Sequence, residues 1–235
     1  MILRRKKNWD SVELKRVSSG YILTMDGKKL KTPGENICTI KDPYLANKVY
    51  EEWSKLNDEI DYKKMPYTRT CFLTLDRSQK ESINLRKKLV GYGMSDLFCY
   101  RAEKGSDLSE IQAESWNPLI GWVQTELQAT LQITNSIMPI KQSIEVEKGW
   151  IKLLQPAQSL TLTALDELVT LSSSLIIGIG LLKGKVSPQK AWKLIRIDEE
   201  WQRAKWGILN EHKKEDLINK AFFMHACRIL VLDRK

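Results

Sequence analysis

The sequence predicts an α+β protein in which a small β-rich N-terminal domain, residues 1–70, precedes a larger all-helical C-terminal domain, residues 71–235. Three observations support this fold class. Short strand-like stretches separated by turn residues fill the first third of the chain. A break falls at Met65-Pro66, where the strand pattern stops. From there, apolar residues recur at helical spacing almost to the end.

The strand pattern covers four segments, which are residues 12–17, 21–25, 28–31 and 37–40. Asp26-Gly27 lies between the second and third segments and predicts a tight hairpin, because a type I′ turn needs two positive φ angles. After the last strand, Asp42 is placed to cap a helix that starts with Pro43 and reaches about Leu56. The N-terminal domain is therefore expected to combine strands with a helix.

Helical periodicity in the C-terminal domain covers six segments, which are residues 78–92, 109–127, 144–154, 161–182, 188–206 and 214–232. Asn117-Pro118 predicts an interruption in the second segment. Six such segments imply a bundle-like domain. The most apolar stretch contains an uninterrupted run of only eight residues, 175–182, whereas a membrane-spanning helix needs roughly 20. We therefore expect no membrane insertion.

The chain is basic, with 38 Lys and Arg against 29 Asp and Glu and a formal net charge of +9. Such a charge suits a nucleic acid, an anionic surface or an acidic protein partner. The basic residues, however, come in short clusters far apart, mostly beside acidic ones, which is typical of a solvated surface. A basic nucleic-acid-binding module is the alternative function, although the sequence has no zinc-finger spacing, RNP-like strand or Gly-rich clamp loop.

The sequence offers no catalytic or metal-binding pattern. Its four cysteines are widely spaced, lie in apolar settings and have no second Cys or His at ligand spacing, so we expect free thiols and no metal site. A Gly-rich phosphate loop and a nucleophile elbow are also missing. We therefore expect a protein that is not an enzyme.

The most informative helix is expected at residues 187–207. Ser187 is placed as its N-cap, Pro188 suits its first turn, and Gly207 is placed as its C-cap. On a helical projection, one face carries an apolar stripe made of Leu194, Ile197, Trp201, Ala204 and, if the helix continues, Ile208. Asp198 falls inside the edge of this stripe.

Asp198 is the candidate functional acid of this helix. A carboxylate partly removed from water needs firm hydrogen-bond donors. Two sources remain open, namely another element of the same chain, which would make Asp198 structural, or a bound partner. Glu199 and Glu200, in contrast, have ion-pair partners at helical spacing in Arg203 and Arg196, respectively.

Three tryptophans on the same helix are also candidates. Trp192, Trp201 and Trp206 could all belong to the core, because large aromatic side chains dominate protein cores. Aromatic residues beside a charge are equally typical of interface hot spots. Both interpretations stay open.

The run Asp-Glu-Glu-Trp-Gln from Asp198, with Trp206-Gly207 four residues after Gln202, resembles the signature of the ATP synthase assembly factors that chaperone the alpha subunit of the catalytic head, the ATP-twelve chaperones. Further segments agree with this family in order, namely Trp9, Asp26-Gly27-Lys28, Lys31-Thr32-Pro33, Glu52-Trp53, Met65-Pro66, Thr68-Arg69, Asp76-Arg77, Tyr92, residues 96–101, Gln112 and residues 116–119. The resemblance extends from about Trp9 to Arg228. The ordered set is specific, whereas any one segment would be weak.

The resemblance implies a two-domain α+β chaperone that binds the free alpha subunit and prevents its aggregation, without cofactor or nucleotide hydrolysis. In the family, an acidic residue in the helix before Trp-Gly is important for activity, and either Asp198 or Glu199 takes that place here. The helical projection favours Asp198. The chain departs from the family where Asp198 replaces a frequent glutamate, where Asn117 replaces a common Asp, and where Ser173-Ser174 replaces a Gly-Ser pair.

The resulting hypothesis assigns partner binding to a main patch, Asp198, Glu199, Trp201, Gln202 and Trp206, and to a second patch, Tyr92, Asp96 and Tyr100. Core packing is the alternative for Tyr92 and Tyr100. We expect a monomer when free, with no nucleic acid bound. Because the start of the chain has no visible transit peptide, the expected compartment is the bacterial cytoplasm, or the mitochondrial matrix if the source is eukaryotic.

Overall fold

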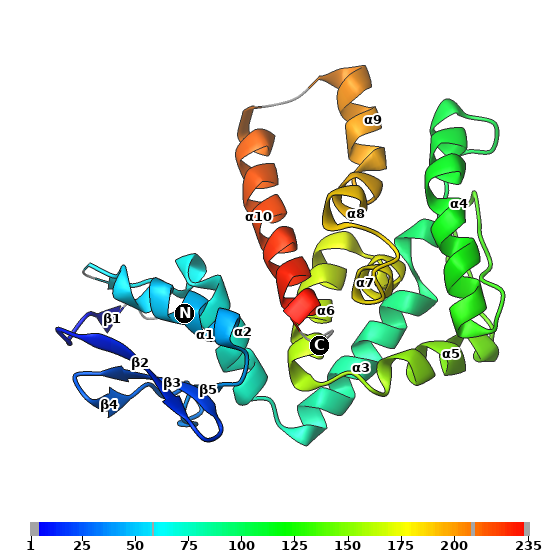
Figure 1. Cartoon of the computed structure of the whole chain (residues 1–235). Helices are drawn as coiled ribbons and strands as arrows, with labels where there is room; N and C mark the ends of the chain where they lie inside the picture. The colour runs from blue at the N-terminus through cyan, green and yellow to red at the C-terminus, as the bar shows by residue number, and fades with distance from the viewer. Residues whose placement is uncertain (1–4, 58, 208–209, 233–235) are drawn as a thin grey trace. The chain divides into compact units, whose positions relative to one another are not determined.

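A computed structural model describes residues 5–57, 59–207 and 210–232. The chain forms two compact units, Met1–Gln79 and Lys80–Lys235 (Figure 1). All strands of the described residues lie before residue 61, and only helices follow, which confirms the α+β class with its small β-rich N-terminal part. The division falls after Gln79, whereas the sequence placed it near residue 70, because a helix at Pro66–Leu75 belongs to the first unit.

The first unit contains a four-stranded antiparallel sheet. Its strands are β2 (Val12–Val17), β3 (Gly20–Met25), β4 (Lys28–Lys29) and β5 (Thr39–Ile40). β3 pairs with all three others. The predicted hairpin is confirmed, since Asp26 and Gly27 have φ angles of 45° and 78°. A separate two-stranded sheet joins β1 (Arg5–Lys6) to β6 (Glu59–Ile60).

Two α-helices complete the first unit. α1 (Pro43–Ser54) begins as predicted, with the Asp42 side chain accepting from the Leu45 N–H, and it buries Leu45, Ala46, Val49 and Trp53. η1 (Tyr62–Lys64) leads to α2 (Pro66–Leu75), which the sequence missed because Pro66 was taken as a break. Proline also suits the first position of a helix, where its missing N–H costs nothing.

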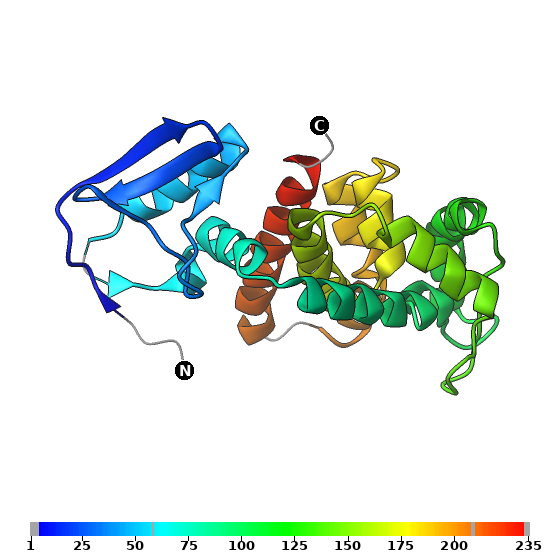
Figure 2. The same cartoon turned by 90° about the horizontal axis from the view of Figure 1, so that it is seen from below.

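The second unit is helical (Figures 1 and 2). Its elements are α3 (Gln79–Met94), η2 (Leu97–Cys99), α4 (Asp107–Leu127), α5 (Ile144–Leu154), α6 (Ser159–Ser172), α7 (Leu175–Leu182), α8 (Pro188–Leu194), α9 (Ile197–Trp206) and α10 (Asn210–Leu232). α7 is the centre of the core, because it contacts α4, α6, α8 and α10 and buries residues 175–181. α10 packs along α6.

Three predictions about helix continuity were wrong, and the first two concern residues 161–182 and Pro118. Residues 161–182 form two helices, because Ser173 adopts a φ of 53° and the Ser174 side chain then caps α7 by accepting from the Ile177 N–H. Pro118 was expected to interrupt a helix, but α4 continues through it. Pro118 and Glu114 one turn earlier are both exposed, so water can reach the carbonyl that loses its donor.

The most consequential difference concerns the helix predicted at residues 188–206, which is two helices, α8 and α9. The Leu194 carbonyl accepts a hydrogen bond of 2.9 Å from the indole Nε1 of Trp116 on α4. In a continuous helix that carbonyl would accept from the Asp198 N–H. The break changes the helical phase after Leu194, so the predicted single apolar stripe does not exist; its last residue, Ile208, lies outside the described residues.

Among the described residues, the helices are too short or too polar to cross a membrane.

Candidate partner-binding site

α9 carries most of the predicted site residues, and none of its side chains is fully buried. α8, directly before it, buries Ala191 and Leu194. α9 is therefore attached to the unit mainly through polar contacts. These contacts lead to α4 on one side and to α10 on the other.

Asp198 is bound to its own chain. Its Oδ1 accepts a hydrogen bond of 2.7 Å from Nε2 of Gln112, a residue of α4 that is 2% exposed. Oε1 of Gln112 in turn accepts a hydrogen bond of 2.8 Å from the Ala102 N–H. Oδ2 of Asp198 has no hydrogen-bond partner within the described part of the chain. The structural interpretation therefore explains one carboxylate oxygen and leaves the second one available.

Arg101 lies near this carboxylate. Its guanidinium packs over the Trp116 ring, 4.8 Å from the centroid, and Nη2 donates to Oδ1 of Asn117 at 3.0 Å. Trp116 stacks on Phe98 with a centroid distance of 4.6 Å. Burial lowers the pKa of Arg101, and the negative charge of Asp198 acts in the opposite direction. Arg101 therefore belongs to the electrostatic surroundings of Asp198.

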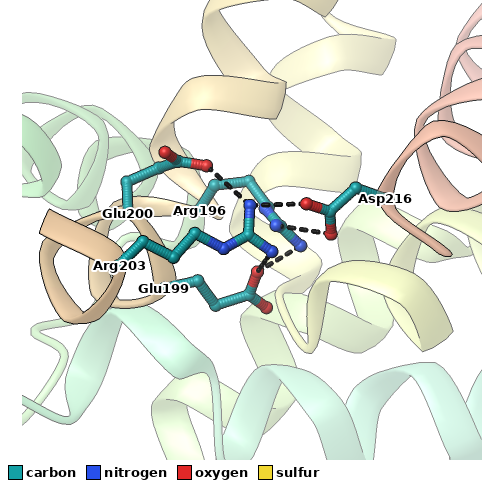
Figure 3. Close-up of polar contacts among 5 residues, drawn as sticks. All are labelled: Arg196, Glu199, Glu200, Arg203 and Asp216. Atoms are coloured by element: carbon teal, nitrogen blue, oxygen red, sulfur yellow. Dashed lines mark hydrogen bonds and ion pairs between the residues drawn. The ribbon is translucent and has the colours of Figure 1, made fainter. Parts of the chain in front are cut away.

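On the other side, an ion-pair cluster joins α9 to α10 (Figure 3). Asp216 on α10 forms ion pairs with Nη2 of Arg196 at 2.7 Å and with Nη1 of Arg203 at 2.5 Å. The hydrogen bond from Arg203, followed by the charge of Arg196, lowers the pKa of Asp216. We call Arg196, Arg203 and Asp216 the clasp, because the two long arginine side chains reach Asp216 on the other helix.

The two other acids of α9 extend the clasp. Glu199 forms ion pairs with Arg196 and, at 3.9 Å, with Arg203, so its predicted partner is confirmed. The sequence predicted Arg196 as the partner of Glu200. In the structure Glu200 pairs with Arg203 instead, at 3.2 Å. A cleft of about 430 Å³ lies beside the clasp. Its walls include Gln202, Trp206 and Glu215.

The tryptophans of this region separate into two groups. Trp192 on α8 packs against Phe223 of α10, with ring centroids 5.3 Å apart. Trp206 is 74% exposed and meets the partly exposed Trp201 edge to face at 6.0 Å. Nζ of Lys205 lies 4.0 Å from the Trp201 ring centroid. Core packing therefore explains Trp192, whereas Trp206 forms an exposed aromatic surface next to the cleft.

In the second predicted patch, Asp96 does not lie on the surface, because it is 0% exposed. Its carboxylate accepts hydrogen bonds from the Phe98 and Ile176 N–H groups and from the Ser174 hydroxyl. The assignment of Asp96 to direct partner contact was wrong, since the residue fixes the start of α7. Burial raises its pKa to about 6 against the effect of these hydrogen bonds.

The two tyrosines of that patch are partly exposed. The hydroxyl oxygen of Tyr100 accepts a hydrogen bond of 3.4 Å from the Ile140 N–H, so its ring supports the loop between α4 and α5. Tyr92 lies near the end of α3. A role of either residue in binding stays a prediction.

The described residues contain no group of three or more His, Cys, Asp or Glu side chains that could hold a metal ion. The four cysteines are buried free thiols. Burial raises the pKa of Cys38 and Cys99 to about 12, so neither is a reactive thiolate at neutral pH.

The sequence-predicted site omitted Gln112, Arg101 and Asp216. Gln112 and Arg101 were visible only as residues of the family pattern, because a helical projection relates residues of one helix and not of two. Asp216 had no signal, since a single acid in a charged helix is common.

Comparisons with known proteins agree with this architecture. The family model of the ATP12 chaperone protein matches residues 6–124. The protein atp12, mitochondrial, of Schizosaccharomyces pombe is 26% identical over 230 residues, which cover 92% of this chain and 79% of that protein.

Two solved structures are similar over the whole length. They are Atp12 from Paracoccus denitrificans and an aspartate-to-lysine mutant of the same protein. Each is 32% identical and superposes with a TM-score of 0.86 over 97% of both chains. Since the family model covers half of the chain and the structural relatives nearly all of it, the protein belongs to the ATP12 chaperone family, which serves ATP synthase assembly.

Proposed function

We propose that the protein binds the free alpha subunit of the ATP synthase catalytic head and prevents its aggregation until the correct neighbouring subunit arrives. Membership of the ATP12 family supports the general role. The observation that carries the proposal is the exposed surface of α9, where a carboxylate oxygen of Asp198 without a partner in the described chain accompanies the exposed Trp206 ring. Buried interface cores are enriched in such aromatic residues.

The mechanism we propose needs no catalysis. The chaperone stabilises an exposed assembly surface by mass action and is displaced when that surface pairs with its final neighbour. A specific but exchangeable contact typically buries about 800 Å² on each partner. α9 and the cleft beside the clasp supply part of that area, with the aromatic Trp206 as its anchor.

The chaperone is proposed to act in the compartment in which the alpha subunit is assembled. In a bacterium the protein would act in the cytoplasm, and in a eukaryote it would act in the mitochondrial matrix; the Schizosaccharomyces pombe relative is a mitochondrial protein. The free chaperone is proposed to be a monomer that becomes a one-to-one complex on binding.

The proposal is tested by co-expressing the alpha subunit with the chaperone and separating the soluble fraction by size-exclusion chromatography. We expect a stoichiometric complex with the wild type and none with Asp198→Lys. Glu114→Lys is the matched control, because it makes the same charge change at an exposed position in the middle of α4. A wild-type chaperone that neither forms a complex nor keeps the alpha subunit soluble would refute the proposal.

The basic composition requires one further control. The same variants are mixed with duplex DNA and with single-stranded RNA at physiological ionic strength. Binding to a phosphate backbone weakens steeply as salt increases. Salt-sensitive binding to nucleic acid in the absence of any alpha-subunit complex would favour the alternative function.

A further inference from the structure

The surroundings of Asp198 are built from three separate segments. Asp198 itself comes from α9, Gln112 comes from α4, and Arg101 and Ala102 come from the segment after η2. The Gln112 amide spans two of these segments, because it contacts Asp198 with its nitrogen and Ala102 with its oxygen. A side-chain amide that links α9 to the rest of the unit is a means of placing the helix and its carboxylate.

We infer that Gln112 and Arg101 are positioning residues for client binding. Gln112 holds the Asp198 carboxylate so that Oδ1 is occupied internally and Oδ2 faces a hydrogen-bond donor of the client, and Arg101 supports this arrangement through its charge. The inference rests on the proposed function, since it names the chemistry of the client group at the same site. That group is a donor such as an arginine, a lysine, a side-chain amide or a backbone N–H.

The orientation of Gln112 is fixed by its neighbours. The Ala102 N–H can only donate, so the oxygen of the Gln112 amide must be the atom that faces it, at 2.8 Å. The amide nitrogen then faces Asp198, at 2.7 Å, where the carboxylate can accept. Gln112 is 2% exposed, so water does not compete at this position. The bond therefore favours one orientation of the Asp198 carboxylate.

Arg101 contributes charge without direct contact. It forms no ion pair with Asp198 within the described residues, and its Nε and Nη1 atoms are buried without a hydrogen-bond partner there. Burying part of a cation with unused donors is costly unless a negative charge lies nearby. Asp198 supplies that charge, and the stack on Trp116 together with the backbone bond from Arg101 N to Thr134 O holds the guanidinium in place.

The Gln112 contribution is tested by Gln112→Leu, which keeps the size of the side chain and removes both hydrogen bonds. We expect the Kd for the alpha subunit to rise by about 10-fold or more, as losing a hydrogen bond to a charged group commonly does. Gln124→Leu is the matched control, because Gln124 also lies on α4 and its oxygen also accepts from a backbone N–H, that of Leu131, at 2.8 Å. It should lower stability and leave Kd within about twofold.

A double-mutant cycle separates positioning from general destabilisation. If Gln112 acts through Asp198, then Gln112→Leu should weaken binding much less in an Asp198→Ala background than in the wild type. Equal losses of affinity in both backgrounds would overturn the inference. Arg101→Gln should weaken binding as well, and Arg101→Lys should restore part of it because the charge remains. A lysine variant no better than the glutamine variant would refute the role of the Arg101 charge.

A measurement on the free protein keeps this inference distinct from the proposed function. Amide hydrogen exchange of α9, residues 197–206, should become faster in Gln112→Leu and stay unchanged in Gln124→Leu. If the wild type does not bind the alpha subunit, the proposed function and the client part of the inference both fall, while α9 exchange still decides whether Gln112 positions the helix. If the wild type binds but Gln112→Leu changes neither the hydrogen exchange of α9 nor the Kd, only the inference falls.

Discussion

α7 and α9 are two short helices of the same unit, and they are attached in opposite ways. α7 buries residues 175–181, and a fully buried acid, Asp96, holds its first turn. α9 buries none of its side chains, and a partly exposed acid, Asp198, links it to α4 through one amide. Apolar packing holds the first helix, whereas hydrogen bonds and ion pairs hold the second.

The difference has energetic consequences. Each fully buried Leu or Ile of α7 contributes roughly 1.5–3 kcal/mol, so α7 cannot move without unfolding the unit. The polar links of α9 contribute about 1 kcal/mol each when part-exposed. A helix held in this way can adjust to a partner at small cost. We therefore expect mutations around α7 to change stability and mutations around α9 to change binding.

The largest expected effect follows from Asp96→Ala. The change leaves the Phe98 N–H, the Ile176 N–H and the Ser174 hydroxyl buried without their acceptor. Each unsatisfied buried group costs about 1–3 kcal/mol, so the free energy of unfolding should fall by roughly 3 kcal/mol or more. Urea unfolding followed by circular dichroism measures it. A loss below about 1 kcal/mol would mean that α7 does not depend on this acid.

The next effect is a pH dependence of stability that Asp96 causes. Burial raises the pKa of Asp96 to about 6 from an ordinary value of 3.8, so the folded protein binds this proton more tightly than the unfolded chain. The corresponding stability is present at low pH and is lost as the pH rises from about 4 to about 6, by up to about 3 kcal/mol.

The measurement compares the wild type with Asp96→Asn, which cannot titrate at this position. The unfolding free energy of the wild type minus that of Asp96→Asn should fall as the pH rises from 4 to 7. Taking this difference removes the contribution of the other carboxylates. A difference that rises with pH would show that the hydrogen bonds to Asp96 outweigh its burial.

A smaller effect is expected at the clasp. In Asp216→Ala, Arg196 and Arg203 lose their shared acid, and their side chains are only 10% and 17% exposed. We expect a loss of about 1–2 kcal/mol and faster hydrogen exchange in α9. Glu199→Ala should cost less, below about 1 kcal/mol, because Glu199 is 50% exposed. Equal losses in the two variants would remove the distinction between the clasp and a surface ion pair.

Local signals in the sequence predicted much of the fold. The bounds of α5 agree with the predicted residues 144–154, and the caps Ser187 and Gly207 lie where the residue types placed them. Such features depend on side chains close in sequence. The break between α8 and α9 was not predictable in this way, because the Trp116 indole that donates a hydrogen bond to the Leu194 carbonyl is 78 positions away.

The candidate site was predictable only in part for the same reason. The helical projection selected Asp198 because a carboxylate beside apolar residues is unusual. Its partner Gln112 is 86 positions away, so the sequence could not distinguish an internal role from an external one. Asp96 was assigned to a surface because its position in the family pattern says nothing about burial. Only the fold places it at the start of α7.

The smallest expected effect on stability is that of Trp206→Ala. It is compared with Trp192→Ala, because both tryptophans belonged to one predicted helix. Trp206 is 74% exposed, so Trp206→Ala should change the free energy of unfolding by less than about 0.5 kcal/mol and weaken alpha-subunit binding by about 10-fold or more. Trp192 packs on Phe223, so Trp192→Ala should lower stability by about 2 kcal/mol or more and leave Kd nearly unchanged. Thermal unfolding and titration calorimetry at a temperature where both variants are folded measure the two quantities. Loss of affinity in Trp192→Ala alone would place the binding surface on α8 and contradict the assignment to α9.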